Sequence, residues 1–214
     1  MALPLRMWKT MTAKDIYDLG IERLKTFNLL PLLPALRACN SGALEDVKNV
    51  NGCANYQWIC GVIDELKPKQ VVELGGAMGV WSLCVLHTLP SDSMLYSITL
   101  PEGGLELSYI VDDYSNFKGI IGSDLNMDNW QGIDLHKTDV WYFDALHTED
   151  HLRKELDLYS PFFKKDCLII FDDVRSFGLY PVWEDVIGGK YGEMTTYEAT
   201  DPLHFTGYGL ATRL

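Results

Sequence analysis

The sequence predicts an α/β fold built on a central, mostly parallel sheet of seven strands with helices on both faces. Helix-like and strand-like hydrophobic patterns alternate along most of the 214 residues, as expected when helices connect parallel strands. Short runs that are apolar on both faces indicate strands covered on each side. Hydrophobic residues make up 47% of the chain, which is enough for one large core.

Composition narrows the class of protein. A formal net charge of -12 opposes binding to nucleic acid, which requires clustered Lys and Arg. The apolar segment 29–36 is broken by Pro31 and Pro34, so neither a signal peptide nor a membrane span is expected. The cysteines form no CxxC pair and lie in apolar patterns. Reduced thiols in a cytoplasmic protein are therefore expected.

The N-terminal part predicts a helical extension, residues 1–52, packed on a core domain formed by residues 53–214. Thr12 is an expected N-cap, and the following helix carries an apolar stripe at Ile16, Leu19, Leu24 and Phe27. Residues 40–52 indicate a loop, and a second amphipathic helix runs up to Pro68. This extension is also a candidate contact in a homo-oligomer, or a lid.

Seven strands are expected in the core domain. The apolar runs that predict parallel strands are residues 70–74, 94–100, 118–121, 140–143 and 168–171. Residues 195–197 and 208–212 predict a final antiparallel pair. Thr148 is the expected N-cap of a helix that ends before Pro161. Ligands of such sheets bind at the carboxyl ends of the strands, so the residues after each run are the candidate site.

A glycine-rich turn follows the first strand. Gly75, Gly76 and Gly79 allow close approach of a ligand, the next helix aims N–H groups at it, and Glu73 adds a carboxylate. The spacing favours a nucleotide-type ligand, although a tight turn without a ligand is the alternative. NAD is less favoured because the G-x-G-x-x-G spacing is absent.

Acidic residues follow the fourth and fifth strands. Asp144, Asp172 and Asp173 would meet at one edge of the sheet, where a magnesium ion could offset their charges. The alternative is that one aspartate caps a turn and another pairs with Arg175. His147 is a candidate base, or else a polar loop residue.

Polar residues also follow the third strand. Ser123 and Asp124 could contact an adenine edge, or form an Asx turn. The other histidines are expected to be surface or packing residues: His87, His136, His151 and His204.

Together these segments resemble the class I S-adenosylmethionine-dependent methyltransferases, which have a Rossmann-like fold. The resemblance is greatest to a branch in which one strand ends in D-x-x-H and a later strand in D-D, related to cephalosporin hydroxylase-like and macrocin O-methyltransferase proteins. It covers residues 57–214 and is strongest in 139–147 and 168–174, with 207–210 similar to the last strand of the family.

The resemblance implies roles for individual residues. The implied cofactor-binding residues are Glu73, Gly75, Gly76, Gly79, Ser123, Asp124 and Asp144. Asp144, Asp172 and Asp173 match magnesium ligands of metal-dependent members, and His147 matches a catalytic lysine, so Asp144 and His147 are the implied catalytic pair. The family's ribose-binding acid is replaced by Thr99, and Glu102 is the nearest acid that could substitute for it.

The implied function is metal-assisted O-methylation of a hydroxyl on a small molecule or sugar, with S-adenosylmethionine as methyl donor and magnesium as the metal. Segments 101–116 and 175–183 are expected to border the acceptor. Two alternatives stay open. One is an S-adenosylmethionine-binding protein without methyl transfer, and the other is a metal-dependent hydrolase that uses the aspartate cluster.

Overall fold

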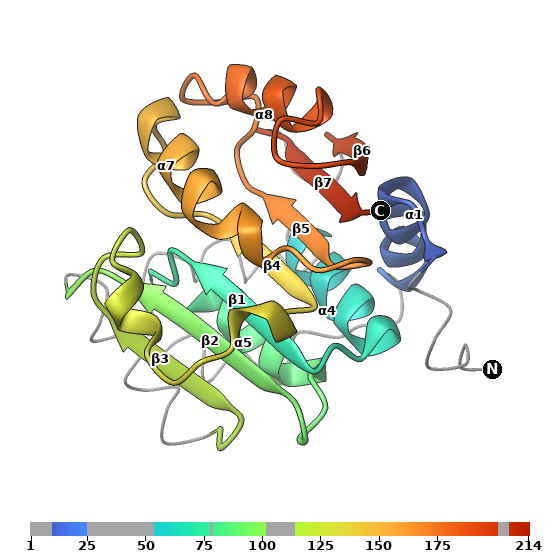
Figure 1. Ribbon diagram of the computed structural model, residues 1–214. Helices are drawn as coiled ribbons and strands as arrows, with labels where there is room; N and C mark the ends of the chain where they lie inside the picture. The colour runs from blue at the N-terminus through green and yellow to red at the C-terminus, as the bar shows by residue number, and fades with distance from the viewer. Residues whose placement is uncertain (1–9, 25–53, 78, 102–113, 201–205) are drawn as a thin grey trace.

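The computed structural model describes residues 10–24, 54–77, 79–101, 114–200 and 206–214, and the description below is confined to them. Seven strands form one sheet in the order β3-β2-β1-β4-β5-β7-β6 (Figure 1). Neighbouring strands are parallel except where β7 pairs with β5 and β6. The strands are β1 (Gln70–Leu74), β2 (Met94–Thr99), β3 (Phe117–Ile121), β4 (Val140–Phe143), β5 (Leu168–Phe171), β6 (Met194–Ala199) and β7 (Tyr208–Arg213).

The predicted fold class and strand set are confirmed. β1, β4 and β5 begin and end where the apolar runs do, and the other strands differ from the prediction by one or two residues at an end. Strand ends are poorly defined by sequence because pairing with a neighbour, rather than the residue itself, decides where the ladder stops.

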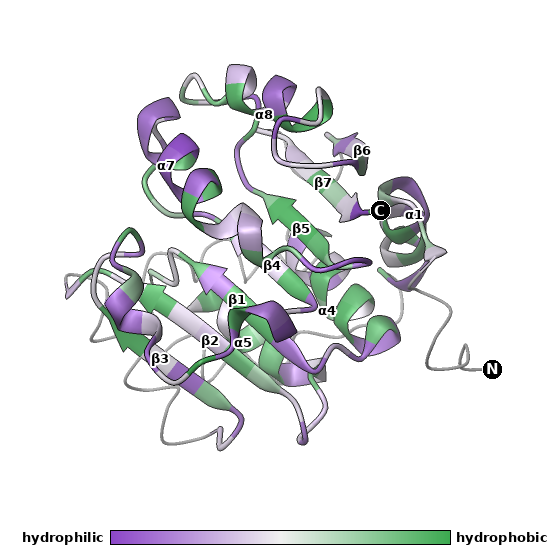
Figure 2. Cartoon of the chain, in the orientation of Figure 1, coloured by the Kyte–Doolittle hydropathy of each residue, from purple (hydrophilic) through white to green (hydrophobic). Residues whose placement is uncertain are grey.

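Helices cover both faces of the sheet. α1 (Ala13–Arg23), α4 (Ala54–Leu66) and α5 (Val80–Thr88) pack on one face, and α7 (Glu149–Tyr159) and α8 (Tyr180–Ile187) on the other. Alternate strand residues supply the two cores: Val71 and Val140 face α4 and α5, whereas Val72 and Trp141 face the α7 side. Figure 2 shows β5 as hydrophobic along most of its length, as a strand buried on both faces requires.

α1 is part of the packed structure. Thr12 caps it, since the Thr12 side chain accepts from the Asp15 amide and the Asp15 carboxylate accepts from the Thr12 N–H at 2.8 Å. The Ala13 amide donates to the Thr195 hydroxyl on β6 at 2.8 Å. A Cβ added at Gly20 would overlap the Trp58 ring, so α1 lies very close to α4. The remainder of the predicted extension, residues 1–9 and 25–52, lies outside the described residues.

Three further expectations concern the start of a helix, the cysteines and membrane-spanning helices. Thr148 caps α7 as predicted, because its hydroxyl accepts from the His151 amide at 3.3 Å. Cys60, Cys84 and Cys167 are free, buried thiols, while Cys39 and Cys53 lie outside the described residues. Among the described helices, none combines the length and apolarity that crossing a bilayer demands.

A buried carboxyl group lies at the centre of the sheet. Glu73 on β1 is 1% exposed and accepts a hydrogen bond from the Ser82 hydroxyl on α5. Burial raises the pKa of Glu73 from 4.5 to about 7. For a carboxyl group whose pKa is higher in the folded state than in the unfolded state, the protonated form favours folding. This contribution to the free energy of unfolding is complete at pH values below the unfolded pKa and is lost as the pH rises through the folded pKa.

We therefore expect Glu73→Gln to be more stable than the natural chain above pH 7, because a neutral amide carries no buried charge. The gain in the free energy of unfolding should be on the order of 2–3 kcal/mol at pH 8 and should vanish near pH 4. Urea unfolding of both proteins from pH 4 to pH 8 measures it. Parallel stability curves for the two proteins would show that Glu73 does not titrate in this range.

Candidate functional site

A pocket of about 270 Å³ opens at the carboxyl ends of β1, β2, β3 and β4. It lies where the strand order reverses between β1 and β4, which is the usual ligand position in a parallel α/β sheet. Its lining residues are Gly75, Ala77, Ile98, Thr99, Leu100, Gly122, Ser123, Asp124, Asp144, Ala145, Leu146 and His151. Five of the predicted cofactor residues are among them: Gly75, Thr99, Ser123, Asp124 and Asp144.

The glycine turn lies directly beside the pocket. Gly75 has φ of 95°, and a Cβ added there would overlap the carbonyl oxygen of Asp144, so only glycine fits. The N–H groups of Gly75 and Gly76 donate to the Ile98 carbonyl at 3.0 and 2.9 Å, so these two amides extend the sheet. The N–H groups expected to face a ligand belong to the first turn of α5, and their contact with a ligand stays a prediction.

Three predicted cofactor residues are not among the lining residues. Gly76 is a buried residue of the turn itself, and Gly79 is the left-handed N-cap of α5, with φ of 74°. Glu73 lies beneath the turn against Ser82. Their positions support the turn, and direct contact of these residues with a cofactor stays a prediction. Glu102 lies outside the described residues.

His147 lies between two of the predicted aspartates. Its Nε2 is 2.8 Å from Asp144 Oδ1, and its Nδ1 is 3.3 Å from Asp173 Oδ2. The hydrogen bond to Asp144 is the main cause that raises the pKa of His147 above 6.5. Burial raises the pKa of Asp144 above 3.8, and His147 opposes that change. The Phe177 ring packs against the imidazole at 5.0 Å between ring centroids.

Tyr142 connects the third aspartate to this group. The Tyr142 hydroxyl lies 3.2 Å from Asp144 Oδ2 and 3.1 Å from Asp172 Oδ2, and its ring stacks on Trp81 at 4.2 Å. Asp172 Oδ1 accepts from the Asp173 amide at 2.9 Å. The structure thus brings Asp144, Asp172 and Asp173 to one place, as predicted. Their carboxylate oxygens contact the imidazole of His147 and the phenol of Tyr142.

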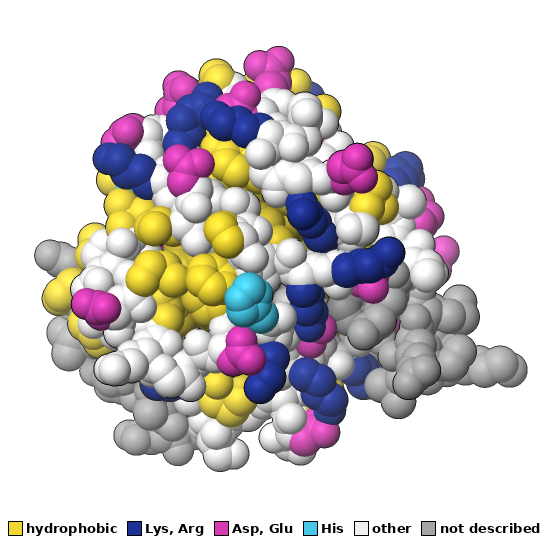
Figure 3. Space-filling model, in the orientation of Figure 1, with side chains coloured by type: hydrophobic (Ala, Val, Ile, Leu, Met, Phe, Trp, Pro, Cys, Tyr) yellow, Lys and Arg dark blue, Asp and Glu magenta, His cyan; other side chains and the backbone are white. Residues whose placement is uncertain are grey.

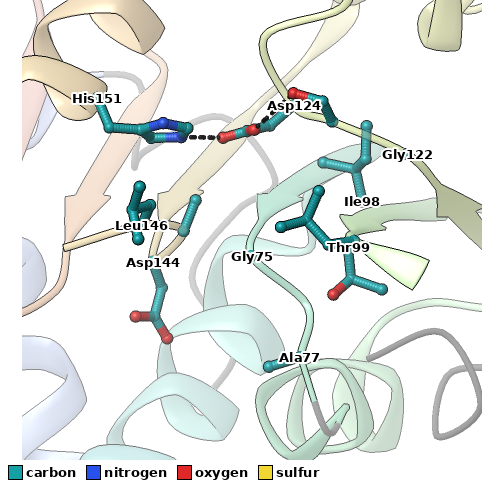
Figure 4. Close-up of a pocket in the computed structure, with 12 residues that line it drawn as sticks. Gly75, Ala77, Ile98, Thr99, Gly122, Asp124, Asp144, Leu146 and His151 are labelled. Carbon is teal, nitrogen blue, oxygen red and sulfur yellow. Dashed lines mark hydrogen bonds and ion pairs between the residues drawn. The ribbon is translucent and has the colours of Figure 1, made fainter. Parts of the chain in front are cut away.

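A second group lies at the other end of the pocket, and the sequence analysis missed it. His151 Nε2 is 2.6 Å from Asp124 Oδ2 and 4.0 Å from Glu155 Oε1. His151 was expected to be a surface or packing residue. Its spacing of four from Glu155 on a predicted helix was the available signal, because such residues share one helix face. Figure 4 shows Asp124 and His151 pointing toward each other at one end of the pocket, with Asp144 at a distance from this pair.

The acidic side chains of the lining are Asp124 and Asp144, and among the lining residues that the structure describes there is neither Lys nor Arg. A pocket with two carboxylates and no fixed cation repels phosphate groups and favours a ligand that carries positive charge. Ile98, Leu100 and Leu146 supply apolar surface for a flat ring.

Sequence comparisons gave no match, either with protein-family models or with curated proteins. Solved structures are similar in fold. A methyltransferase from Geobacter sulfurreducens has a TM-score of 0.61 at 15% identity, covering 85% of this chain and 90% of that one. The O-methyltransferase TomG from Streptomyces achromogenes, solved with S-adenosylmethionine, has a TM-score of 0.62 at 14% identity, covering 95% and 99%.

A methyltransferase from Podospora anserina bound to S-adenosylhomocysteine also matches, with a TM-score of 0.61 at 14% identity, covering all of this chain and 99% of that one. At such identities the likeness concerns the fold. The strand order, the antiparallel β7 and these neighbours agree. The chain has the Rossmann-like fold of the class I methyltransferases.

Proposed function

We propose that this protein is an S-adenosylmethionine-dependent methyltransferase that methylates a hydroxyl group of a small molecule. One observation carries the proposal: the pocket at the β1–β4 switch point has an acidic lining, with neither Lys nor Arg among its described residues, and its Asp144 is hydrogen bonded to His147. The first feature suits a positively charged cofactor, and the second places a proton acceptor beside it.

The lining residues fit S-adenosylmethionine by their chemistry. When bound, this cofactor supplies an electrophilic methyl group on a positively charged sulfur. Asp144 would stabilise the positive charge, Asp124 and Thr99 would accept hydrogen bonds from adenosine, and Gly75 would allow close approach. Methyltransferases of this fold have been solved with this cofactor or its product, which supports the assignment.

His147 is the proposed general base. A neutral imidazole takes the proton from the acceptor hydroxyl, and the resulting oxyanion becomes the nucleophile. Asp144 holds Nε2 at 2.8 Å, so the acceptor hydroxyl would replace the longer contact of 3.3 Å between Nδ1 and Asp173. Nδ1 would then receive the proton, and Asp144 would stabilise the imidazolium that forms. Phe177 is 65% exposed beside His147 and offers an apolar surface against which the acceptor can be held.

Asp144, Asp172 and Asp173 do not fit magnesium as they are arranged. Both oxygens of Asp144 and both of Asp172 contact His147, Tyr142 or a backbone amide. The imidazole already supplies the positive charge that an ion would bring to Asp144 and Asp173. Magnesium prefers an octahedral shell of oxygens, which these contacts would have to break. We therefore assign no step to magnesium.

A small-molecule acceptor agrees with the charge of the protein. The net charge is -12, and on the face shown in Figure 3 the Lys and Arg side chains lie among Asp and Glu side chains, with hydrophobic side chains gathered near the centre. A net negative charge opposes binding to the phosphate backbone of nucleic acids, which favours a small-molecule acceptor.

Cofactor binding can be tested by calorimetric titration with S-adenosylhomocysteine. We expect one site per chain and a tighter complex for Thr99→Asp, by about tenfold, because a carboxylate accepts stronger hydrogen bonds from ribose hydroxyls than a neutral hydroxyl does. Asp150→Asn is the control, since Asp150 lies on the exposed side of α7 and should not affect affinity. Absence of heat from binding in all three proteins would refute the cofactor assignment.

Loss of the base should separate chemistry from binding. His147→Gln should reduce the rate of methyl transfer to a panel of phenols and sugars by at least ~100-fold. Its affinity for S-adenosylhomocysteine should change little, because His147 is not a lining residue. An equal loss of affinity would instead indicate a binding role.

The same base predicts the pH profile. The rate should rise with pH through a pKa above 6.5, because only neutral imidazole accepts the proton and Asp144 raises its pKa. Asp173→Asn should move this limb to lower pH by removing one nearby negative charge. Asn tolerates the left-handed backbone at this position, where φ is 55°. An unchanged limb would exclude His147 as the titrating group.

Magnesium should have little effect on catalysis. Initial rates of metal-free protein with and without millimolar Mg²⁺ should agree within about twofold, because the aspartate oxygens already have partners. Strong activation by Mg²⁺ that is lost in Asp172→Asn would show that the ion displaces His147 from the carboxylates.

A further inference from the structure

Asp124, His151 and Glu155 form a compact group at the end of the pocket away from His147. His151 and Glu155 lie one helical turn apart on α7, and Asp124 follows β3. One ligand atom from each residue lies within 4.8 Å of the other two. Among the residues that the structure describes, this is the one group of three acidic, histidine or cysteine side chains with that property.

Glu155 lacks a partner for one of its oxygens. The residue is 1% exposed, and Oε1 is buried without a hydrogen bond. This atom is 4.0 Å from His151 Nε2, too far for a hydrogen bond but directed at the same group. A buried carboxylate oxygen without a donor is costly, so it indicates a missing proton or cation.

The charges point to a cation. Two carboxylates and one neutral imidazole bear a net charge of −2, which a single divalent ion would neutralise. The alternative occupant is a proton shared by the two carboxyl groups.

The geometry suits a small metal ion. Ligand atoms bound tetrahedrally at 2.0–2.1 Å from zinc lie about 3.4 Å apart. The two distances from His151 Nε2, 2.6 Å to Asp124 and 4.0 Å to Glu155, lie on either side of this value. Modest side-chain rotations would equalise them. One imidazole nitrogen with two carboxylates favours a first-row transition ion such as zinc over magnesium, which prefers oxygen ligands.

We propose that Asp124, His151 and Glu155 bind one Zn²⁺ ion, leaving a coordination position open to the pocket. Asp124 and His151 both line the pocket, so a fourth ligand can come from there. Zinc would bind Asp124 Oδ2, which faces His151, and Oδ1 would remain for the hydrogen bond proposed with adenosine. The ion would join α7 to the segment after β3.

Surrounding contacts hold the proposed ligands in place. The Tyr159 hydroxyl donates to the Asp124 backbone carbonyl, and the Trp130 indole N–H donates to Tyr159 at 2.7 Å. Ser123 lies 3.5 Å from the other oxygen of Asp124. Outer contacts of this kind orient ligands before an ion arrives.

The test is zinc binding to tag-free, metal-free protein, measured by competition with a chromogenic chelator. We expect one ion per chain and a higher Tm with zinc, because the ion binds only the folded site. Glu155→Gln and His151→Asn should each weaken binding at least 100-fold, since loss of an outer contact alone costs 10–100-fold. Gln keeps the volume of Glu and can donate to Asp124, so that variant should fold.

Asp172→Asn is the matched control, because Asp172 belongs to the His147 end of the site and should leave zinc affinity unchanged. Absence of binding, or equal affinity in Glu155→Gln, would overturn the proposal in favour of a shared proton. A thiolate charge-transfer band on adding Co²⁺ would place the ion at a cysteine and also overturn it. Neither measurement uses a methyl donor, so its outcome is independent of the proposed methyl transfer.

Discussion

The close approach of the turn after β1 to the end of β4 is the constraint on which the site depends. Gly75 lies against the carbonyl of Asp144 with no room for a Cβ, while its amide continues the ladder to Ile98 on β2. The turn is therefore held by both neighbours of β1. Because the turn is held in place, space remains between it and the segments that follow β2, β3 and β4, and that space is the pocket.

Adjacent residues at the end of β4 lie in different surroundings. Trp141 faces one core, Tyr142 faces the other, and Asp144 has left the strand. Alternation along β4 thus buries the Tyr142 ring against Trp81 while its hydroxyl reaches Asp144 and Asp172. A rigid aromatic stack fixes the phenol, and the phenol in turn fixes two carboxylates. Precise placement of acidic groups therefore follows from hydrophobic packing.

Sequence patterns predicted the elements well because their causes are local. Runs apolar on both faces identified β1, β4 and β5, and the hydroxyls of Thr12 and Thr148 identified two helix starts. The site was only partly predictable. That Asp144 and His147 are close follows from their spacing, but the contact of His151 with Asp124 depends on how the first turn of α7 packs against the segment after β3. Such packing is a tertiary property, which no local pattern encodes.

The two ends of the pocket balance their negative charge differently, and this difference agrees with the two roles proposed for them. At one end, His147 contacts Asp144 and Asp173 through its two ring nitrogens, so an imidazolium can donate one hydrogen bond to each carboxylate. At the other end, the Nε2 atom of His151 contacts Asp124, and Glu155 Oε1 has no partner. An imidazolium can release a proton to restore a base, whereas a buried, unpartnered oxygen needs a proton or a cation beside it. The first arrangement suits proton transfer, and the second suits a bound ion.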